Sequence, residues 1–323
     1  MSSGRALFTR FPGNPIIRAA DLPYDANAVF NPGAAEVNGE TVLLLRVEDL
    51  RGISHLTVAR SRDGVSDWRI NSEPSLRSAP VRYPEEVWGI EDPRLTWLEE
   101  MQAWVIAYTA YSRRGPLVSF ARTADFRSFR RFGAALLPED KDAALFPRRF
   151  GGRWAVIHRP TPVHGNASMW ISYSPDLRHW GDFSLLLEPR EGAWWDSAKI
   201  GLGPPPLETP EGWLVMYHGS HLTASGALYR TGLALLDLED PRTVLRRSDE
   251  WVIGPTEPYE RVGDVGGVVF PCGWVLHRAT NELRVYYGAA DTSVALATAR
   301  LDDVLEYLRS SPRPTPQRRR VRL

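Results

Sequence analysis

The sequence contains a single cysteine, Cys272, among its 323 residues. One cysteine cannot close an intramolecular disulfide or build a cysteine-based zinc site, so a small scaffold held together by either is excluded. No apolar run approaches the ~20 residues that a membrane-spanning helix needs. The N-terminal residues lack the apolar segment of a secretion signal. We therefore expect a protein located in the cytoplasm, with no membrane partner.

Net charge is also lacking, because 39 Lys and Arg balance 39 Asp and Glu. Proteins that bind nucleic acid or anionic membranes usually carry an excess of positive charge, so we expect no nucleic-acid partner. The one basic run, residues 318–320, lies in a Pro- and Arg-rich tail that starts at about residue 310. We expect this tail to be solvated and flexible.

Short β-type segments, in contrast, are abundant. Ten runs rich in β-branched or aromatic residues are bounded by Gly, Pro, Asn or Asp, and each predicts a strand. They cover residues 41–49, 54–61, 103–112, 117–124, 153–160, 168–175, 212–219, 231–238, 283–290 and 293–301. Only residues 302–310 show a helical pattern. The 12 Trp, 11 Tyr and 11 Phe suit an all-β core, although aromatic faces also stack on sugars.

The predicted strands fall into a recurring unit with similar polar corners at residues 61–68, 123–129, 174–180 and 237–244. Units start near residues 31, 92, 145, 200 and 266. Repeats of about 40 to 50 residues with four strands each are typical of β-propeller blades, and these units are somewhat longer. A two-sheet sandwich also uses short strands but does not explain the repeated corners. We predict an all-β fold, a five-bladed β-propeller with a central substrate funnel, formed by residues 1–323 as one domain.

In a propeller the inner loops meet at the axis, so residues near the unit starts are candidates for the site. They combine carboxylates with cations, a mixture suited to a polyhydroxylated ligand together with an anion. The candidates are Asn31, Arg46, Asp49, Glu91, Asp92, Arg94, His158, Arg159, Lys199, His218 and Asp291.

Asp92 and Asp291 could each have a purely structural role instead of a catalytic or binding one. Asp92 stands in the tetrapeptide Glu-Asp-Pro-Arg and could simply cap a turn. Asp291 could likewise be a turn residue at a strand end. Glycosidic cleavage, however, needs a carboxyl group that protonates the leaving oxygen and a nucleophile on the opposite face of the sugar ring.

The cations Arg159, Lys199 and His218 stand in matched positions of the repeat. They could be two surface charges and a satisfied strand histidine, yet Lys199 lies between a Trp-Trp pair and a rigid Gly-Pro run, which indicates a preorganised loop. Converging cations suit a phosphate dianion. The seven histidines show no metal-binding spacing, so we expect no metal and no organic cofactor.

Taken together, the motifs resemble glycoside hydrolase family 130, the β-mannoside phosphorylases. The matching strings include NPGAAEVNGETVLLLRVED, GIEDPRLTW, IHRP, WWDSAKIGLGPPPLETPEGWLVMYHG and VYYGAADTSVALAT, in order from residue 31 to about 298. The resemblance implies a five-bladed propeller that cleaves a β-mannosidic bond with inorganic phosphate, inverts the anomeric centre and releases α-mannose 1-phosphate.

The resemblance also implies roles for single residues. Asp92 would be the general acid, passing its proton through the mannosyl 3-hydroxyl. Phosphate would be bound by Arg159, Lys199 and His218, with Tyr229 as a hydroxyl neighbour. The mannosyl ring would contact Asn31, Arg46 and Asp291, and we add Asp49 as a further substrate-binding candidate. Arg94 would orient Asp92 or support its loop.

Several alternatives stay open. The linkage can be β-1,4, which we favour for mannooligosaccharides, or β-1,2. Some relatives are inverting β-mannosidases that use water and lack the phosphate-binding cations, and a non-catalytic carbohydrate-binding propeller is the third possibility. Gly266 and Gly267 replace a family pattern with Asn before VVF, which affects acceptor choice. Relatives often form homo-oligomers, so this chain is a candidate for one.

Overall fold

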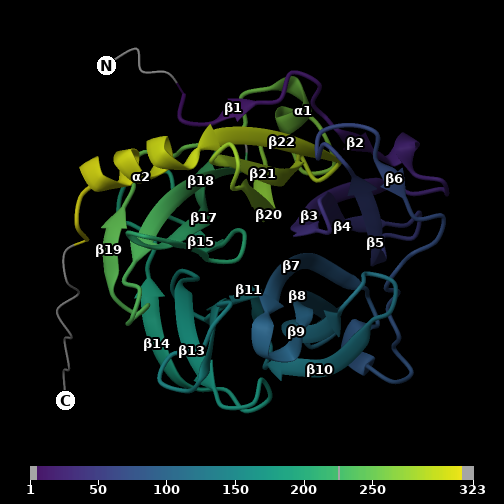
Figure 1. The fold of residues 1–323 in the computed structure, drawn as a ribbon, viewed down its shortest axis with the longest axis horizontal. Coiled ribbons are helices and arrows are strands. Elements are labelled where there is room, and N and C mark those ends of the chain that lie inside the picture. Colours follow the sequence, from purple (N-terminus) through teal and green to yellow (C-terminus); the bar gives the residue numbers. More distant parts are fainter. Residues whose placement is uncertain (1–5, 225, 315–323) are drawn as a thin grey trace.

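A computed structural model describes residues 6–224 and 226–314. Within these ranges the strands form five antiparallel sheets arranged around one axis (Figure 1). The prediction of an all-β, five-bladed propeller is thus confirmed.

Each sheet is one blade, and in the first four blades the first strand in sequence is the innermost. The first blade contains β3 (Ala28–Val37), β4 (Glu40–Glu48), β5 (Ser54–Ser61) and β6 (Arg69–Ile70). The second contains β7 (Ile90–Leu98), β8 (Ala103–Ser112), β9 (Gly115–Thr123) and β10 (Arg130–Leu136). The third contains β11 (Asp140–Leu145), β12 (Trp154–Pro160), β13 (Met169–Ser174) and β14 (Gly181–Leu187). The fourth contains β15 (Lys199–Leu202), β16 (Leu207–Thr209), β17 (Gly212–Thr223), β18 (Gly226–Leu236) and β19 (Val244–Arg247).

The fifth blade is made from both ends of the described chain. It contains β20 (Val269–His277), β21 (Glu282–Ala289) and β22 (Ser293–Arg300), and the N-terminal strands β1 (Thr9–Arg10) and β2 (Ile17–Arg18) pair with β22. These N-terminal strands supply the outer edge of the fifth blade, so pairing the first strands with the last one joins the two ends of the described chain and closes the ring.

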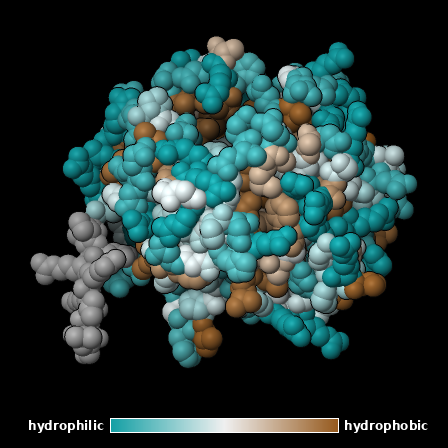
Figure 2. All heavy atoms as spheres, turned by 60° about the horizontal axis from the view of Figure 1, so that its bottom comes forward, coloured by the Kyte–Doolittle hydropathy of each residue, from teal (hydrophilic) through white to brown (hydrophobic). Residues whose placement is uncertain are grey.

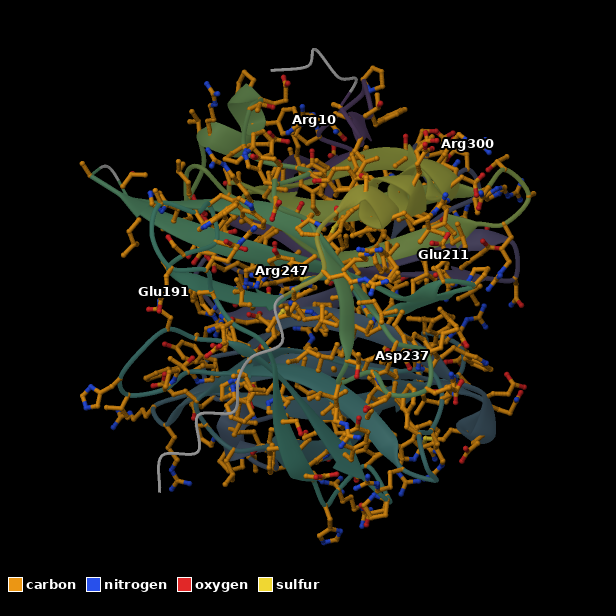
Figure 3. The ribbon with its side chains drawn as sticks, turned by 90° about the vertical axis from the view of Figure 1, so that its left-hand side faces the viewer. Arg10, Glu191, Glu211, Asp237, Arg247 and Arg300 are labelled. Atoms are coloured by element: carbon orange, nitrogen blue, oxygen red, sulfur yellow. The ribbon has the colours of Figure 1, made fainter. Side chains whose placement is uncertain are left out.

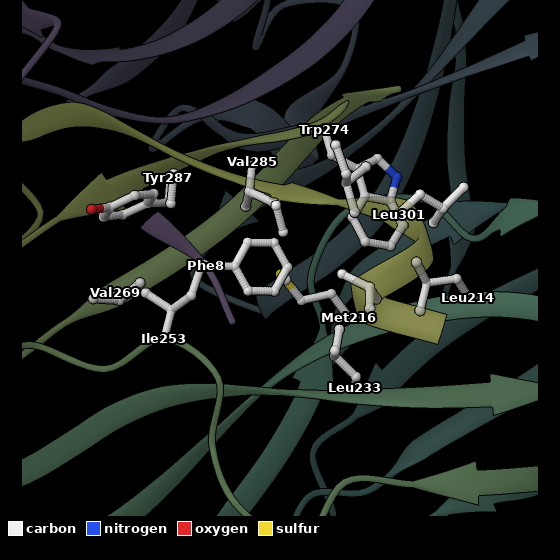
Figure 4. Close-up of a cluster of buried hydrophobic side chains, with 14 of the residues drawn as sticks. Phe8, Leu214, Met216, Leu233, Ile253, Val269, Trp274, Val285, Tyr287 and Leu301 are labelled. Carbon is white, nitrogen blue, oxygen red and sulfur yellow. The ribbon is translucent and has the colours of Figure 1, made fainter. Parts of the chain in front are cut away.

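Apolar side chains from neighbouring blades pack against each other in five clusters, one between each pair of blades. The cluster between the fourth and fifth blades is shown in Figure 4, where Phe8 lies among Met216, Leu233 and Val285. Phe8 directly precedes β1, so the same segment closes the ring through its backbone and through its side chain.

Helices are few. The amphipathic α2 (Leu301–Ser310) buries Val304 and Leu308 against the fifth blade, as its predicted pattern requires. The others are α1 (Pro258–Arg261) and three 3₁₀ turns, η1 (Ala19–Asp21), η2 (Pro84–Glu86) and η3 (Glu99–Met101). Among the described residues no helix is long and apolar enough to cross a membrane. The face seen in Figure 2 is mainly hydrophilic, with scattered hydrophobic side chains.

All ten predicted strands are present, and they are the second and third strands of the blades. The polar corners that revealed the repeat are Asp-capped turns: Asp63, Asp125, Asp176 and Asp237 each accept hydrogen bonds from the backbone N–H groups two and three residues later. The tail from about residue 310 is described only to residue 314, where Ser311 and Pro312 accept hydrogen bonds from the β19 residues Arg246 and Arg247. Residues 315–323 lie outside the described part.

Candidate active site

The inner strands of the first three blades share an irregularity at the same place. Each of β3, β7 and β11 has a register shift in its pairing with the next strand. At the shift each strand carries one residue with a left-handed backbone conformation: Asn31 (φ 44°), Asp92 (φ 51°) and Asp142 (φ 54°). Asn and Asp tolerate this conformation better than other residues that carry a Cβ. A bulge of this kind turns a side chain away from the regular alternation. Three polar side chains are thereby gathered at one end of the inner strands.

Asp92 is held by two donors. Its Oδ1 accepts hydrogen bonds from Asn31 Nδ2 and Arg46 Nη1, both at 2.9 Å. Arg46 also reaches Glu91 at 3.1 Å and donates from Nε to Ser54 Oγ at 2.9 Å. Burial alone would raise the pKa of the Asp92 carboxyl, but the charges of Arg46, Lys141 and Arg94 outweigh it and hold this pKa below its ordinary value.

Asp291 follows β21 and is the second carboxylate on this side. Its pKa is raised to about 6, first because burial disfavours the charged form and also because Asp92 carries a like charge nearby, against the opposing effect of Arg46. The environments of Asp92 and Asp291 thus separate the pKa values of the two carboxyls, as in many acid–base sites. On the same side the buried Asn31 Oδ1 has no hydrogen-bond partner among the described residues and packs closely against Gly288.

The fourth blade contributes the other half of the site through its strand register. Lys199 on β15 lies opposite Ser220 on β17, and Ser220 lies opposite Tyr229 on β18. Cross-strand partners share a face of the sheet, and so do residues two apart, which adds His218 to this group. The Lys199 ammonium is 5.0 Å from the centre of the Tyr229 ring.

Two polar atoms of this group have no partner within the described part of the chain, namely His218 Nδ1 and Ser220 Oγ, although both are buried. A buried polar atom without a partner is costly, and a ligand can supply what is missing. Burial lowers the pKa of His218 to about 3 despite the neighbouring Asp142, so the imidazole is neutral near pH 7. His218 also packs at 4.4 Å, ring centre to ring centre, on Phe270 from the fifth blade.

Asp142 connects this group to the third blade. Its carboxylate accepts a hydrogen bond from Arg159 Nε at 2.6 Å and lies 3.4 Å from His218 Nε2. The positive charge of Arg159, followed by that of the neighbouring groups, overcomes the effect of burial and keeps the pKa of Asp142 far below its ordinary value. Gly201 makes the approach possible, because a Cβ at that position would overlap both His218 and Asp142.

Arg94 connects the two halves of the candidate site. It is 1% exposed and donates to the backbone oxygens of Asp92, Leu202 and Gly203, and its Nη2 lies 3.4 Å from Asp142 Oδ1. With its donors occupied by the protein, Arg94 supports the loop of Asp92, as expected. These hydrogen bonds tie the Asp92 side to Leu202 and Gly203 at the end of β15, the strand that begins with Lys199.

The loop before Lys199 is anchored in the same manner. The buried Asp196 carboxylate accepts hydrogen bonds from Arg190, Tyr217 and Arg247, the last of which is labelled in Figure 3. This network holds the Trp-Trp-Asp segment against β17 and β19, which agrees with the preorganised loop predicted there.

The structure therefore brings Asn31, Arg46, Asp92 and Asp291 together on one side and Arg159, Lys199, His218 and Tyr229 on the other. Asp49 is placed differently: its carboxylate accepts hydrogen bonds from Arg51 and from the backbone of Ile53 in the turn after β4. Among the described residues no cluster of three or more His, Cys, Asp or Glu side chains could hold a metal ion.

Sequence reasoning did not single out Asp142 or Ser220. Asp142 occupies the same position in its blade as Asn31 and Asp92 do in theirs. The sequence, however, predicts the start of that unit near residue 145, three residues after Asp142. Ser220 lies two residues after His218 but one residue beyond the predicted strand 212–219; extending that strand with its period of two could have identified it.

Comparison with known proteins assigns the chain to a family. The profile of glycoside hydrolase family 130, described as β-1,4-mannooligosaccharide phosphorylase, matches residues 11–310. The chain belongs to glycoside hydrolase family 130. It is 36% identical to a β-1,4-mannooligosaccharide phosphorylase of Ruminococcus albus over 93% of this chain and 90% of that protein.

Other members of glycoside hydrolase family 130 act on another linkage. A β-1,2-mannobiose phosphorylase from Listeria innocua, solved with β-1,2-mannobiose, superposes with a TM-score of 0.84 at 32% identity, covering 94% of this chain and 99% of that one. A further structure, 26% identical with a TM-score of 0.79, covers 92% of this chain and 95% of its own and is described among family members that are glycoside hydrolases targeting β-1,2 mannosidic linkages in Candida mannan.

Proposed function

We propose that this family member catalyses the phosphorolysis of a β-mannosidic bond in mannooligosaccharides, with β-1,4 favoured, giving α-mannose 1-phosphate with inversion. The observation that carries the proposal is the group around His218: a lysine, a tyrosine and two unpartnered buried polar atoms face one site. Hydrolysis by water or simple sugar binding requires no cation in such a group, whereas a phosphate anion pairs with Lys199 and accepts hydrogen bonds from hydroxyl groups.

In this proposal Asp92 is the general acid and phosphate is the nucleophile. Phosphate is already anionic, so the site needs no base to activate it. A dianion bound beside Arg159 and Lys199 also offsets the cations that lower the pKa of Asp92, and so raises that pKa toward the range in which a carboxyl can donate a proton. Binding of the second substrate thus prepares the acid for its step.

Asn31 and Arg46 would bind the mannosyl ring together with Asp291, which is the side where Asn31 Oδ1 has no hydrogen-bond partner among the described residues. Phosphate and Asp92 must act on opposite faces of the ring for inversion. Asp92 belongs to the second blade and Lys199 to the fourth, which supports this assignment. The favoured β-1,4 linkage is supported by the Ruminococcus relative, and β-1,2 cleavage is the second candidate because relatives of similar identity act on that linkage.

The test is to incubate the purified protein with β-1,4-mannobiose and with β-1,2-mannobiose, each with and without inorganic phosphate. Mannose 1-phosphate formed only with phosphate is the expected product, and the sugar that is consumed gives the linkage. Free mannose formed at a rate independent of phosphate would make the protein a mannosidase and overturn the proposal.

Variants assign the roles. Asp92→Asn should abolish most turnover, because loss of a positioned acid costs about 10²–10⁴ in rate.

Lys199→Ala should mainly raise the KM for phosphate. If Lys199→Ala left the phosphate dependence unchanged, the anion site would lie elsewhere.

A further inference from the structure

An exposed aromatic pair lies near the candidate active site. Trp88 is 42% exposed and Tyr111 is 38% exposed, and their rings meet edge to face with centroids 5.4 Å apart. Val87, 43% exposed, precedes them in the chain. We call Val87, Trp88 and Tyr111 the aromatic platform. Large side chains of this kind in water usually mark a contact surface.

The backbone places the platform on the same end of the propeller as Asp92. Trp88 lies four residues before Asp92, so their Cα atoms are at most about 14 Å apart. Gly89 packs directly on Ser54, whose hydroxyl accepts the hydrogen bond from Arg46, and Arg46 in turn holds Asp92. Tyr111 is the penultimate residue of β8 and is hydrogen-bonded to the same segment, since the Trp88 N–H donates to Tyr111 O.

The platform is held rigidly although it is exposed. Just before it, the fully buried Glu86 accepts hydrogen bonds from Tyr108 Oη, from Arg131 Nε and Nη2, and from the Ala79 backbone. Burial and the charge of Glu86 raise the pKa of Tyr108 well above its ordinary value, so this phenol remains a donor. A fixed aromatic surface loses little conformational entropy when it binds a ligand.

The chemistry of the platform suits a sugar better than a protein. The C–H face of a pyranose packs on an indole or phenol ring, while the Trp N–H and Tyr O–H at the ring edges can bond to hydroxyls. Three residues are far too few for a stable protein interface, which uses about 20–30 residues a side. A separation of at most about 14 Å from Asp92 can be spanned by a short oligosaccharide.

We propose that the aromatic platform of Val87, Trp88 and Tyr111 is a distal acceptor subsite, which binds a mannosyl unit on the reducing side of the cleaved bond and makes the enzyme prefer chains longer than a disaccharide. This inference rests on the proposed function, because it extends the substrate of that same site.

The test compares substrates of increasing length. Phosphorolysis of mannobiose, mannotriose and mannotetraose, in the linkage series that the protein accepts, is measured for the wild type, Trp88→Ala, Trp88→Phe and Tyr111→Ala. The wild type should have a higher kcat/KM for the longer chains. Trp88→Ala and Tyr111→Ala should lower it about two- to tenfold for mannotriose and mannotetraose and leave mannobiose unchanged, while Trp88→Phe should retain most of the preference.

A matched control is Phe183→Ala, which removes another exposed aromatic ring (53%) from the outer strand β14. It should not change the dependence on chain length. Equal losses for mannobiose and mannotetraose in Trp88→Ala would overturn the distal subsite and indicate a general effect on the loop. An altered oligomeric state with unchanged chain-length preference would also overturn it, in favour of a protein contact. Either result leaves the proposed function intact, because mannobiose phosphorolysis tests that separately.

Discussion

Asp142 illustrates how a single residue organises the candidate site. Its carboxylate lies between Arg159, Arg94 and His218, all of them buried, and each of these side chains belongs to a different blade. The aspartate therefore holds together Arg159 and the neutral His218, which the proposal assigns to phosphate, and Arg94, which supports the loop of Asp92. Removing its charge leaves two guanidinium groups without their buried counter-ion.

We expect Asp142→Asn to lower the free energy of unfolding by about 3–5 kcal/mol, the usual cost of breaking a buried ion pair. Urea denaturation measures this value. The control is Asp240→Asn, which breaks an ion pair with Arg242 in which both side chains are 46% exposed, and exposed pairs contribute only about 0–1 kcal/mol. Equal losses in the two variants would show that Asp142 is not the electrostatic centre of the site.

Asp291 gives a prediction for pH. Its pKa in the folded protein is raised from 3.8 to about 6, so folding favours the protonated form. This contribution to stability is fully present below pH 3.8 and is lost as the pH rises through 6. Asp291→Asn removes the ionisation. Relative to the wild type, the variant should become progressively more stable between pH 4 and pH 7. A stability difference that stays constant over this range in denaturant titrations would contradict the assignment.

At the scale of elements, the bulged inner strands and the closure of the ring decide the shape of the funnel. Bulges in β3, β7 and β11 aim one polar residue each toward the site, and the fifth blade has a register shift between Pro271 and Gly273 in β20. The ring itself depends on β1, β2 and the side chain of Phe8, which come from the opposite end of the chain.

The closure can be tested with Phe8→Ala. Phe8 is 3% exposed and packs between two blades, so truncation should lower the free energy of unfolding by about 3–5 kcal/mol. Thr9→Ala on the same segment is the control, because this exposed side chain should change stability by no more than about 0.5 kcal/mol. Similar small effects of both changes would mean that the N-terminal segment contributes little to the closed ring.

At the scale of the whole molecule, ligand binding and stability are linked. A phosphate that binds only the folded propeller should stabilise it by about 2.7 kcal/mol at 100 times its Kd. We expect inorganic phosphate to raise the melting temperature of the wild type, compared with chloride at equal ionic strength, and Lys199→Ala to show a smaller shift. Equal shifts for both proteins would point to a general salt effect and against a phosphate site at Lys199.

The sequence by itself determined the β class, the five units and the second and third strands of each blade, because alternating apolar runs and Asp-capped corners are local properties of the chain. It also gave the candidate residues, through the ordered motifs of the family. It did not give the inner strands β3, β7, β11, β15 and β20 as strands, since they carry prolines, bulges and polar residues that break the β pattern.

Only the tertiary structure decided which of these residues meet. The contacts of Asp142 join residues up to 76 positions apart across three blades, as with the neutral His218. The group of Lys199, Ser220 and Tyr229 exists only because of the register of β15, β17 and β18. Likewise, Asp49 accepts hydrogen bonds inside its own turn, although it directly follows β4, the strand that contains Arg46. Burial and cross-blade charge set the protonation of Asp92, Asp291 and His218, and these arise only when the ring closes.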